Sequence, residues 1–472
     1  MSLTPEEQHM CFKNYWQKIE QATENQPTKF LRDYLTIQQQ LQRPVRQSNI
    51  YYEWKKYMDG HERKEELVKM LDYAHYYQQV TEAKLSTAKL SEKMRHICNI
   101  ETDVTNVFFI QFLKYASANN LSENEIFKVI DLVENYLARR IVCNMPGNAL
   151  TQVFCALHKD VLKSIEEYSS ANVELGNSYS DILTYHIMRR DGNYQLPRDM
   201  QFVESIKTRD AYHMLKPFQI FLFERLENSV HGEYNDVATD MKKKDATIEH
   251  IMPQTLSDKW KKERGADWER IHEQYLHTMA NLTLTGYNSQ YSNLPFIEKR
   301  EMENGFKDSA FRLNIYLRSC NQWTEEELKT RQDTLLNVFM RLWPMPTTTF
   351  EPLKREAESA SLDDEDFEFT GKNLQAFTFR GIRHTVNTWK EMLIQVCGYI
   401  LIDKRSTIEW LCANEKPGFL THPEIGRHKL APKLYVWTDN STATKINILQ
   451  GLFKECNIPA SELIFEFRSN AD

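Results

Sequence analysis

The sequence of 472 residues lacks several features that define common protein classes. Its eight cysteines never approach the C-x-x-C spacing of zinc ribbons, zinc knuckles and thioredoxin-type redox motifs, which excludes these classes. With only 14 Gly, 15 Pro and 41% hydrophobic residues, the chain is neither collagen-like nor disordered throughout. We therefore expect a soluble globular protein of about three or four compact units.

Long apolar runs are also absent. The most apolar stretch, residues 107–113, is interrupted by Gln111. It is far shorter than the roughly 20 residues that span a bilayer. The first seven residues carry acidic side chains and no apolar segment, so we expect neither a transmembrane helix nor a secretory signal. These features predict a cytoplasmic protein without membrane contact.

An excess of positive charge is missing as well, because 59 Lys and Arg stand against 66 Asp and Glu, a net charge of −7. Nucleic-acid contact must therefore come from a local patch.

The periodicity of apolar residues divides the chain. Helical spacing dominates to about residue 230, as in the stripe that follows Ser122 and Glu125, which fit a capping box. An acidic run at residues 351–370 is typical of a solvated linker. The predicted fold is mainly α with α+β parts. We predict a helical domain at residues 1–238, a ββα domain with flanking helices at 239–345, an acidic linker at 346–370 and a C-terminal α/β accessory domain at 371–472.

The central region contains the residues that could perform chemistry. Residues 247–251 and 281–285 are predicted to be short strands, and residues 294–304 a helix with Asn293 as N-cap. Glu249 and His250 are adjacent in the first strand, and Asn288 follows the second. Phosphodiester hydrolysis needs a base that is neutral near pH 7, which His250 can supply. Mg²⁺ prefers oxygen ligands, which Glu249 and Asn288 can supply.

Adjacent residues of a regular strand face opposite sides, so Glu249 and His250 can share a site only where the strand ends or bulges. Pro253 favours such an end. Asn281, at the start of the second strand, is placed either to tie the connecting loop or to hold the imidazole of His250. His272 and His277 precede this strand, and we expect them to have surface or packing roles because Mg²⁺ prefers oxygen to imidazole.

Three motifs carry a family resemblance: E-H-I-x-P-Q at residues 249–254, N-L-T-L at 281–284, and N-x-x-x-S-N-x-x-F-x-E-K-R at 288–300. Together they resemble the HNH (His-Me finger, ββα-metal) nuclease domain in the C-terminal part of GmrSD-type modification-dependent restriction endonucleases. A similar arrangement occurs in the HNH domain of CRISPR RNA-guided DNA nucleases. The resemblance implies hydrolysis of DNA with Mg²⁺ or Mn²⁺ as cofactor.

The same resemblance assigns roles to individual residues. It implies that His250 is the general base, that Asn281 is the central asparagine and that Glu249 and Asn288 bind the metal, with Asn293 as the alternative to Asn288. It also implies that Lys299 and Arg300 reach backbone phosphates.

The sequence departs from the family pattern in two places. The D-G-Q-Q-R motif of the ParB-like nucleotidase domain does not occur, and Ala280 stands where the family often has Gly. The resemblance therefore implies either a ParB-like nucleotidase partner subunit or a missing N-terminal domain. It also implies a role in restriction and antiviral defence, directed at DNA with modified cytosines.

Two other functions fit the same residues. One is a non-catalytic DNA-binding or assembly subunit of a restriction system, and the other is a ribonuclease toxin.

Overall fold

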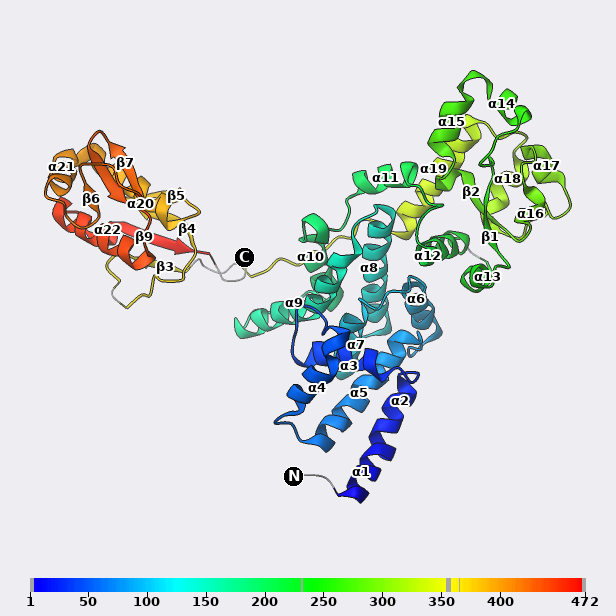
Figure 1. Cartoon of the computed structure of the whole chain (residues 1–472), viewed down its shortest axis with the longest axis horizontal. Coiled ribbons are helices and arrows are strands. Elements are labelled where there is room, and N and C mark those ends of the chain that lie inside the picture. The colour runs from blue at the N-terminus through cyan, green and yellow to red at the C-terminus, as the bar shows by residue number, and fades with distance from the viewer. Residues whose placement is uncertain (1–3, 231, 354–357, 365, 469–472) are drawn as a thin grey trace. The chain divides into compact units, whose positions relative to one another are not determined.

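The computed structural model describes residues 4–230, 232–353, 358–364 and 366–468. The chain forms two compact units, Met1–Pro352 and Leu353–Asp472 (Figure 1). Helices dominate the first unit, and small antiparallel sheets lie mainly in the second, which confirms the predicted fold class. No helix in these described ranges is both long and apolar enough to cross a membrane.

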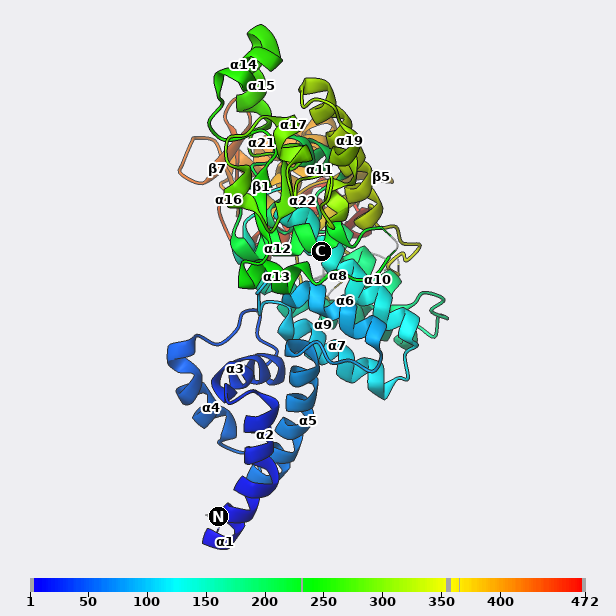
Figure 2. The ribbon, with the colours of Figure 1, turned by 90° about the vertical axis from the view of Figure 1, so that its right-hand side faces the viewer.

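The first part of unit 1 is helical. Its helices are α1 (Pro5–Cys11), α2 (Gln17–Ala22), α3 (Pro27–Gln38), α4 (Ile50–Met58), α5 (Arg63–Thr81), α6 (Ala88–Cys98), α7 (Asn106–Ala118), α8 (Glu123–Val142), α9 (Leu150–Ser170), α10 (Tyr179–Met188), α11 (Asp199–Thr208), α12 (Lys216–Glu227) and α13 (Val237–Lys243). Helix α2 packs beside α5, which in turn contacts α7 (Figure 2). Ser122 caps α8 as expected, since its side chain accepts the backbone N–H of Glu125.

The rest of unit 1 contains a two-stranded antiparallel sheet and short helices. The elements are β1 (Thr247–His250), α14 (Asp258–Arg264), α15 (Trp268–Tyr275), β2 (Leu282–Thr285), α16 (Asn288–Tyr291), α17 (Phe296–Glu301), α18 (Ile315–Ser319) and α19 (Glu325–Leu342). Thr247 pairs with Thr285, and His250 pairs with Leu282. The other edge of β2 is covered by side chains, because Arg331 donates to the carbonyl of Leu282 and Asn314 to that of Leu284. The strands and α16 thus form a fixed ββα unit.

One hydrophobic core joins the two parts of unit 1. It includes Val133 and Leu137 of α8, Ile248 of β1, Leu284 of β2 and Phe339 of α19. The predicted boundary between residues 238 and 239 therefore does not coincide with a boundary between cores. A second, smaller core surrounds Trp260 and Trp323 and supports the segments that connect β1, β2 and α17.

Buried polar contacts fix α8 against α19. Glu134 accepts hydrogen bonds from the indole of Trp343 at 3.0 Å and from Arg225 at 2.8 Å. Arg139 donates to the carbonyls of Trp343 and Pro197. Because buried charges need such partners, these contacts hold the end of α19 against the helical part.

Unit 2 is an α/β module. It consists of β3 (Ser359–Ser361), β4 (Leu374–Phe379), β5 (Ile382–Thr385), α20 (Trp389–Asp403), α21 (Arg405–Ala413), β6 (Phe419–Leu420), β7 (Arg427–Ala431), β8 (Leu434–Trp437), α22 (Thr442–Cys456) and β9 (Leu463–Phe467). Its sheets have the strand orders β3-β9-β4-β5 and β6-β8-β7. Both sheets and the helices share a core that includes Phe377, Val396 and Leu449.

The acidic segment requires a correction. Residues 346–370 were predicted to form a linker, yet Ser359–Ser361 is strand β3 and pairs with β9. Ala360 is buried in this strand, and backbone pairing outweighs the acidic composition of its neighbours. Residues 354–357 and 365 of the predicted linker lie outside the described residues.

Candidate active site

A cavity of about 400 Å³ lies at the end of β1. Glu249, His250 and Asn288 all contribute to its wall, together with Gln254 and Asn293. Strand β1 ends at His250, and the adjacent residues Glu249 and His250 both line the cavity. The structure therefore brings together a carboxylate, an imidazole and an amide that come from two separate elements.

Asn281 fixes the chain that follows His250. Its Oδ1 accepts the backbone N–H of Met252 at 2.8 Å and the indole N–H of Trp323 at 3.2 Å. Its Nδ2 donates to the carbonyls of Met252 at 2.9 Å and Leu276 at 3.0 Å. Of the two roles considered from the sequence, the geometry is that of tying the loop. Asn281 therefore holds the backbone of the turn that follows His250.

Lys299 is not placed as the sequence predicted. Its side chain is completely buried, and its Nζ donates to Glu249 Oε1 at 2.5 Å and to the carbonyls of His250 at 2.9 Å and Ile251 at 3.3 Å. A buried ammonium held in this way cannot reach a DNA phosphate, which corrects the predicted contact. The motif placed a cation on a helix, but the sequence did not reveal that this helix turns it inward.

The Glu249–Lys299 pair controls the charge of the cavity wall. Burial raises the pKa of the Glu249 carboxyl and lowers the pKa of the Lys299 ammonium, and the attraction between the two groups opposes both shifts. Lys299 binds one carboxylate oxygen, Oε1.

Arg300 is half-buried and makes its contacts within unit 1. Its guanidinium donates to the carbonyl of Cys320, to Asn321 Oδ1 at 3.0 Å and to Glu301 Oε1 at 2.9 Å. A phosphate contact by Arg300 remains a prediction.

Asn288 is the first residue of α16. Its Nδ2 donates to the carbonyl of Ile248 at 3.0 Å, which sets the orientation of the amide. Because the nitrogen is engaged by the strand, the oxygen is the atom that Asn288 can offer to a cation. Asn293, the alternative ligand, is exposed in the turn after α16 and lines the same cavity.

His250 has different neighbours at its two ring nitrogens. Nε2 lies 3.1 Å from His277 Nδ1, and Nδ1 lies 3.4 Å from Gln254 Nε2, which belongs to the cavity wall. The ring also packs on Tyr212, with 4.3 Å between ring centroids. Burial, followed by the nearby His277 and Lys299, lowers the pKa of His250 to about 3. His250 is therefore neutral at pH 7, the form in which an imidazole can accept a proton.

Sequence reasoning missed a cluster on the other side of His250. Asp210, His213 and His277 have ligand atoms within 4.8 Å of one another, although we expected His277 to have only a surface or packing role. Asp210 and His213 have i,i+3 spacing in a turn, which was the only local signal. Because His277 is distant from both residues along the chain, the sequence did not indicate that it joins them. His272, by contrast, donates a hydrogen bond from Nε2 to the carbonyl of Pro253.

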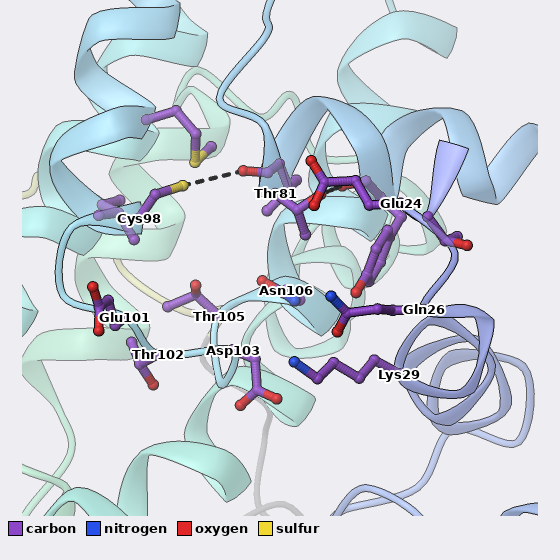
Figure 3. Close-up of a pocket in the computed structure, with 15 residues that line it drawn as sticks. Glu24, Gln26, Lys29, Thr81, Cys98, Glu101, Thr102, Asp103, Thr105 and Asn106 are labelled. Carbon is purple, nitrogen blue, oxygen red and sulfur yellow. Dashed lines mark hydrogen bonds between the residues drawn. The ribbon is translucent and has the colours of Figure 1, made fainter. Parts of the chain in front are cut away.

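Another cavity, of about 430 Å³, lies in the helical part of unit 1 (Figure 3). Its lining includes the carboxylates of Glu24, Glu101 and Asp103 but only one lysine, Lys29. The thiol of Cys98 donates to the carbonyl of Val80. The excess of negative charge disfavours a phosphate ligand here, so we place no DNA contact in this cavity.

The region around β1 and β2 matches a known protein family. Residues 196–338 match the family of GmrSD restriction endonucleases, C-terminal domain. The predicted resemblance to GmrSD-type restriction endonucleases is therefore confirmed for this GmrSD-like segment. The segment contains both strands, the cavity and the cluster around His277. A search of curated proteins found no match.

Proposed function

We propose that this protein is a divalent-metal-dependent HNH endonuclease that hydrolyses DNA phosphodiester bonds. The observation that supports the proposal is the convergence of Glu249, His250 and Asn288 on one cavity within the GmrSD-like segment. Restriction endonucleases, the family that this segment matches, act on DNA, which supports DNA as the substrate.

The donor atoms fit a hard cation. One carboxylate oxygen of Glu249 and the amide oxygen of Asn288 are ligands of the type that Mg²⁺ and Mn²⁺ accept, with water completing the coordination. Asn293 can take the place of Asn288 on the same wall. When bound, the cation supplies electrostatic stabilisation for the charge that develops on the phosphate and the leaving oxygen.

His250 acts as the general base of this reaction. Its Nδ1 is the nitrogen directed toward the cavity wall at Gln254, whereas Nε2 contacts His277. The neutral ring accepts a proton from the attacking water at Nδ1, and the hydrogen bond between Nε2 and His277 orients the ring. The negative charge of a bound phosphate favours the protonated imidazole that results.

Lys299 and Asn281 are positioning residues. Lys299 holds Glu249 Oε1 and the carbonyl of His250 with one ammonium, so the carboxylate of Glu249 is tied to the backbone of His250. Asn281 holds the backbone of Met252 at both its N–H and its carbonyl.

The biological role that we propose is defence against foreign DNA. Modified cytosines as the recognised feature and a ParB-like nucleotidase as the partner follow from the family resemblance alone. The D-G-Q-Q-R motif is absent from this chain, so a nucleotide requirement would depend on that partner.

Incubation of the purified protein with unmodified plasmid, phage DNA with modified cytosines, and RNA tests this proposal, in Mg²⁺, in Mn²⁺ and in EDTA. We expect metal-dependent cleavage of DNA that is lost in His250→Ala. The control His422→Ala, which replaces an exposed histidine of unit 2, should retain it. Cleavage that persists in EDTA or in His250→Ala would overturn the mechanism, and cleavage of RNA alone would identify the ribonuclease alternative.

The ion pair favours a second candidate function. Since Lys299 already pairs with Glu249, the buried carboxylate has a partner without a metal, as would suit a non-catalytic DNA-binding or assembly subunit. Calorimetry separates the candidates. An enzyme binds Mg²⁺ or Mn²⁺ in a manner that depends on Glu249, whereas a scaffold binds DNA with a salt-dependent affinity and has no such metal site.

A further inference from the structure

We propose that Asp210, His213 and His277 form a separate binding site for a transition-metal cation of the Zn²⁺ type. This cluster lies next to His250 but outside the oxygen-lined cavity, and the inference does not depend on nuclease activity.

The ligands are held by local structure before any metal binds. The backbone N–H of His213 donates to Asp210 Oδ1 at 3.0 Å, and His213 Nδ1 lies 2.8 Å from Asp210 Oδ2. The backbone N–H of Ala211 donates to the carbonyl of His277 at 2.8 Å, which ties this turn to the segment before β2. The rings of His213 and His277 pack edge to face, with 4.6 Å between centroids and 68° between the ring planes. Two segments distant in sequence thus present three ligands together.

The spacing suits a small tetrahedral ion. Ligand atoms about 2 Å from such an ion lie roughly 3.3 Å from one another. The three ligand atoms of the cluster lie within 4.8 Å of one another, so small side-chain rotations suffice. A cation bound between Asp210 and His213 would take the place of the hydrogen bond between them. Asp210 and His213 are exposed, which leaves the fourth position to water.

The donor set distinguishes this site from the proposed magnesium site. Two imidazoles and one carboxylate suit Zn²⁺ and similar ions, whereas Mg²⁺ prefers oxygen ligands alone. Because His277 Nδ1 contacts His250 Nε2, the nitrogen that His277 offers to a cation is Nε2. With a cation bound, His277 Nδ1–H donates to His250 Nε2, whereas without the cation His250 Nε2–H donates to His277 Nδ1, as the general-base role requires. Metal-binding histidines usually engage a hydrogen-bond partner through the other nitrogen, and His250 fills that position here.

Metal titration of the complete chain tests the proposal. We would strip the protein of metal, add Co²⁺ and follow its visible absorption, and measure Zn²⁺ affinity by calorimetry in competition with a chelator. Even an outer-shell substitution typically weakens metal affinity by about 10- to 100-fold. We therefore expect His213→Ala and Asp210→Asn each to weaken Zn²⁺ binding by at least about tenfold.

The control variants separate this site from other ligands. His422 pairs with Glu424 at 3.4 Å, in a histidine–carboxylate pair, so His422→Ala should retain full Zn²⁺ affinity. Glu249→Gln should retain it too, because Glu249 belongs to the oxygen-lined cavity. Both Asp210 and His213 are exposed, so their substitution should leave the circular dichroism spectrum unchanged. Equal Zn²⁺ affinity in the wild type, His213→Ala and Asp210→Asn would overturn the proposal, whether or not the protein cleaves DNA.

Discussion

The two sides of His250 differ in chemistry and in burial. On the cavity side stand oxygen donors, Glu249 and Asn288, and the carboxylate is tied to the buried Lys299. On the other side stand the imidazole of His277 and the exposed pair of Asp210 and His213. The imidazole ring of His250 thus lies between the oxygen donors of the cavity and a more exposed set of donors that includes imidazole nitrogens. From this difference we expect the two sides to bind different cations, and we expect only the cavity side to contribute strongly to the free energy of unfolding.

The largest expected effect is on catalysis at the cavity side. His250→Ala removes the general base, and general-base catalysis typically contributes about 10²- to 10⁴-fold to a rate. Single-turnover cleavage of plasmid DNA measures the loss. His213→Ala, on the exposed side, should cleave at the wild-type rate in Mg²⁺. If the two variants lose the same activity, the two sides of His250 do not differ in their contribution to catalysis.

The buried ion pair gives the next largest effect. Lys299→Met leaves the Glu249 carboxylate buried without its partner, and breaking such a pair typically costs about 3–5 kcal/mol. The double variant Glu249→Gln, Lys299→Met removes both charges and should recover much of this loss. Urea unfolding measures both free energies.

An exposed ion pair provides the control for this experiment. Lys259 and Glu298 are 3.3 Å apart, with side chains 73% and 50% exposed. Lys259→Met should cost less than about 1 kcal/mol, because water screens the pair. A cost for Lys299→Met no larger than this one would show that the cavity side is not the more firmly held.

Asn281 supports the cavity side through backbone contacts. Asn281→Ala removes the partners of the buried Met252 N–H and of the Trp323 indole, and each buried group left unpaired costs about 1–3 kcal/mol. We expect a lower unfolding free energy and, because the turn after His250 loosens, a lower cleavage rate. Thr334→Ala on an exposed part of α19 is the control. Unchanged stability in Asn281→Ala would contradict the positioning role.

The smallest effect concerns pH. Burial lowers the pKa of His250 to about 3, whereas an unperturbed histidine has a pKa of about 6.5. Between these values the unfolded chain binds a proton that the folded protein does not, so stability falls as pH falls from about 6.5 toward 3. In His250→Gln this contribution is absent. The unfolding free energy should therefore change less between pH 7 and pH 5 in the variant, by at most about 1.4 kcal/mol per pH unit.

Two other buried histidines, which lie away from His250, do not disturb this comparison. Burial lowers the pKa of His158 and of His186 to about 4, and these residues act equally in the wild type and in His250→Gln. The same pH slope in both proteins would show that His250 is not held neutral.

Local patterns in the sequence predicted much of the fold. The helical spacing after Ser122 predicted α8, and the alternation at residues 247–251 predicted β1 to within one residue. The strand end that Pro253 favoured is the feature that lets Glu249 and His250 face one cavity. These successes share a cause, because capping, periodicity and proline act over a few residues.

The failures concern properties that depend on tertiary packing. Lys299 follows an acidic residue in the short helix α17. Only the packed structure reveals that its ammonium contacts the carbonyl of His250, at the end of β1. Residues 359–361 have an acidic context, yet pairing with β9 makes them a strand. Asp210 and His277 meet through the hydrogen bond between Ala211 and His277, which no local pattern encodes.

A crystal structure of the protein soaked in Mn²⁺ tests the central claim most directly, because the anomalous signal of the ion locates it without reference to activity. We predict a peak in the cavity at the end of β1, with Glu249 and an oxygen of Asn288 or Asn293 as its protein ligands and His250 beside it. A cavity without manganese at a saturating concentration, with Glu249 still bound only to Lys299, would contradict the account.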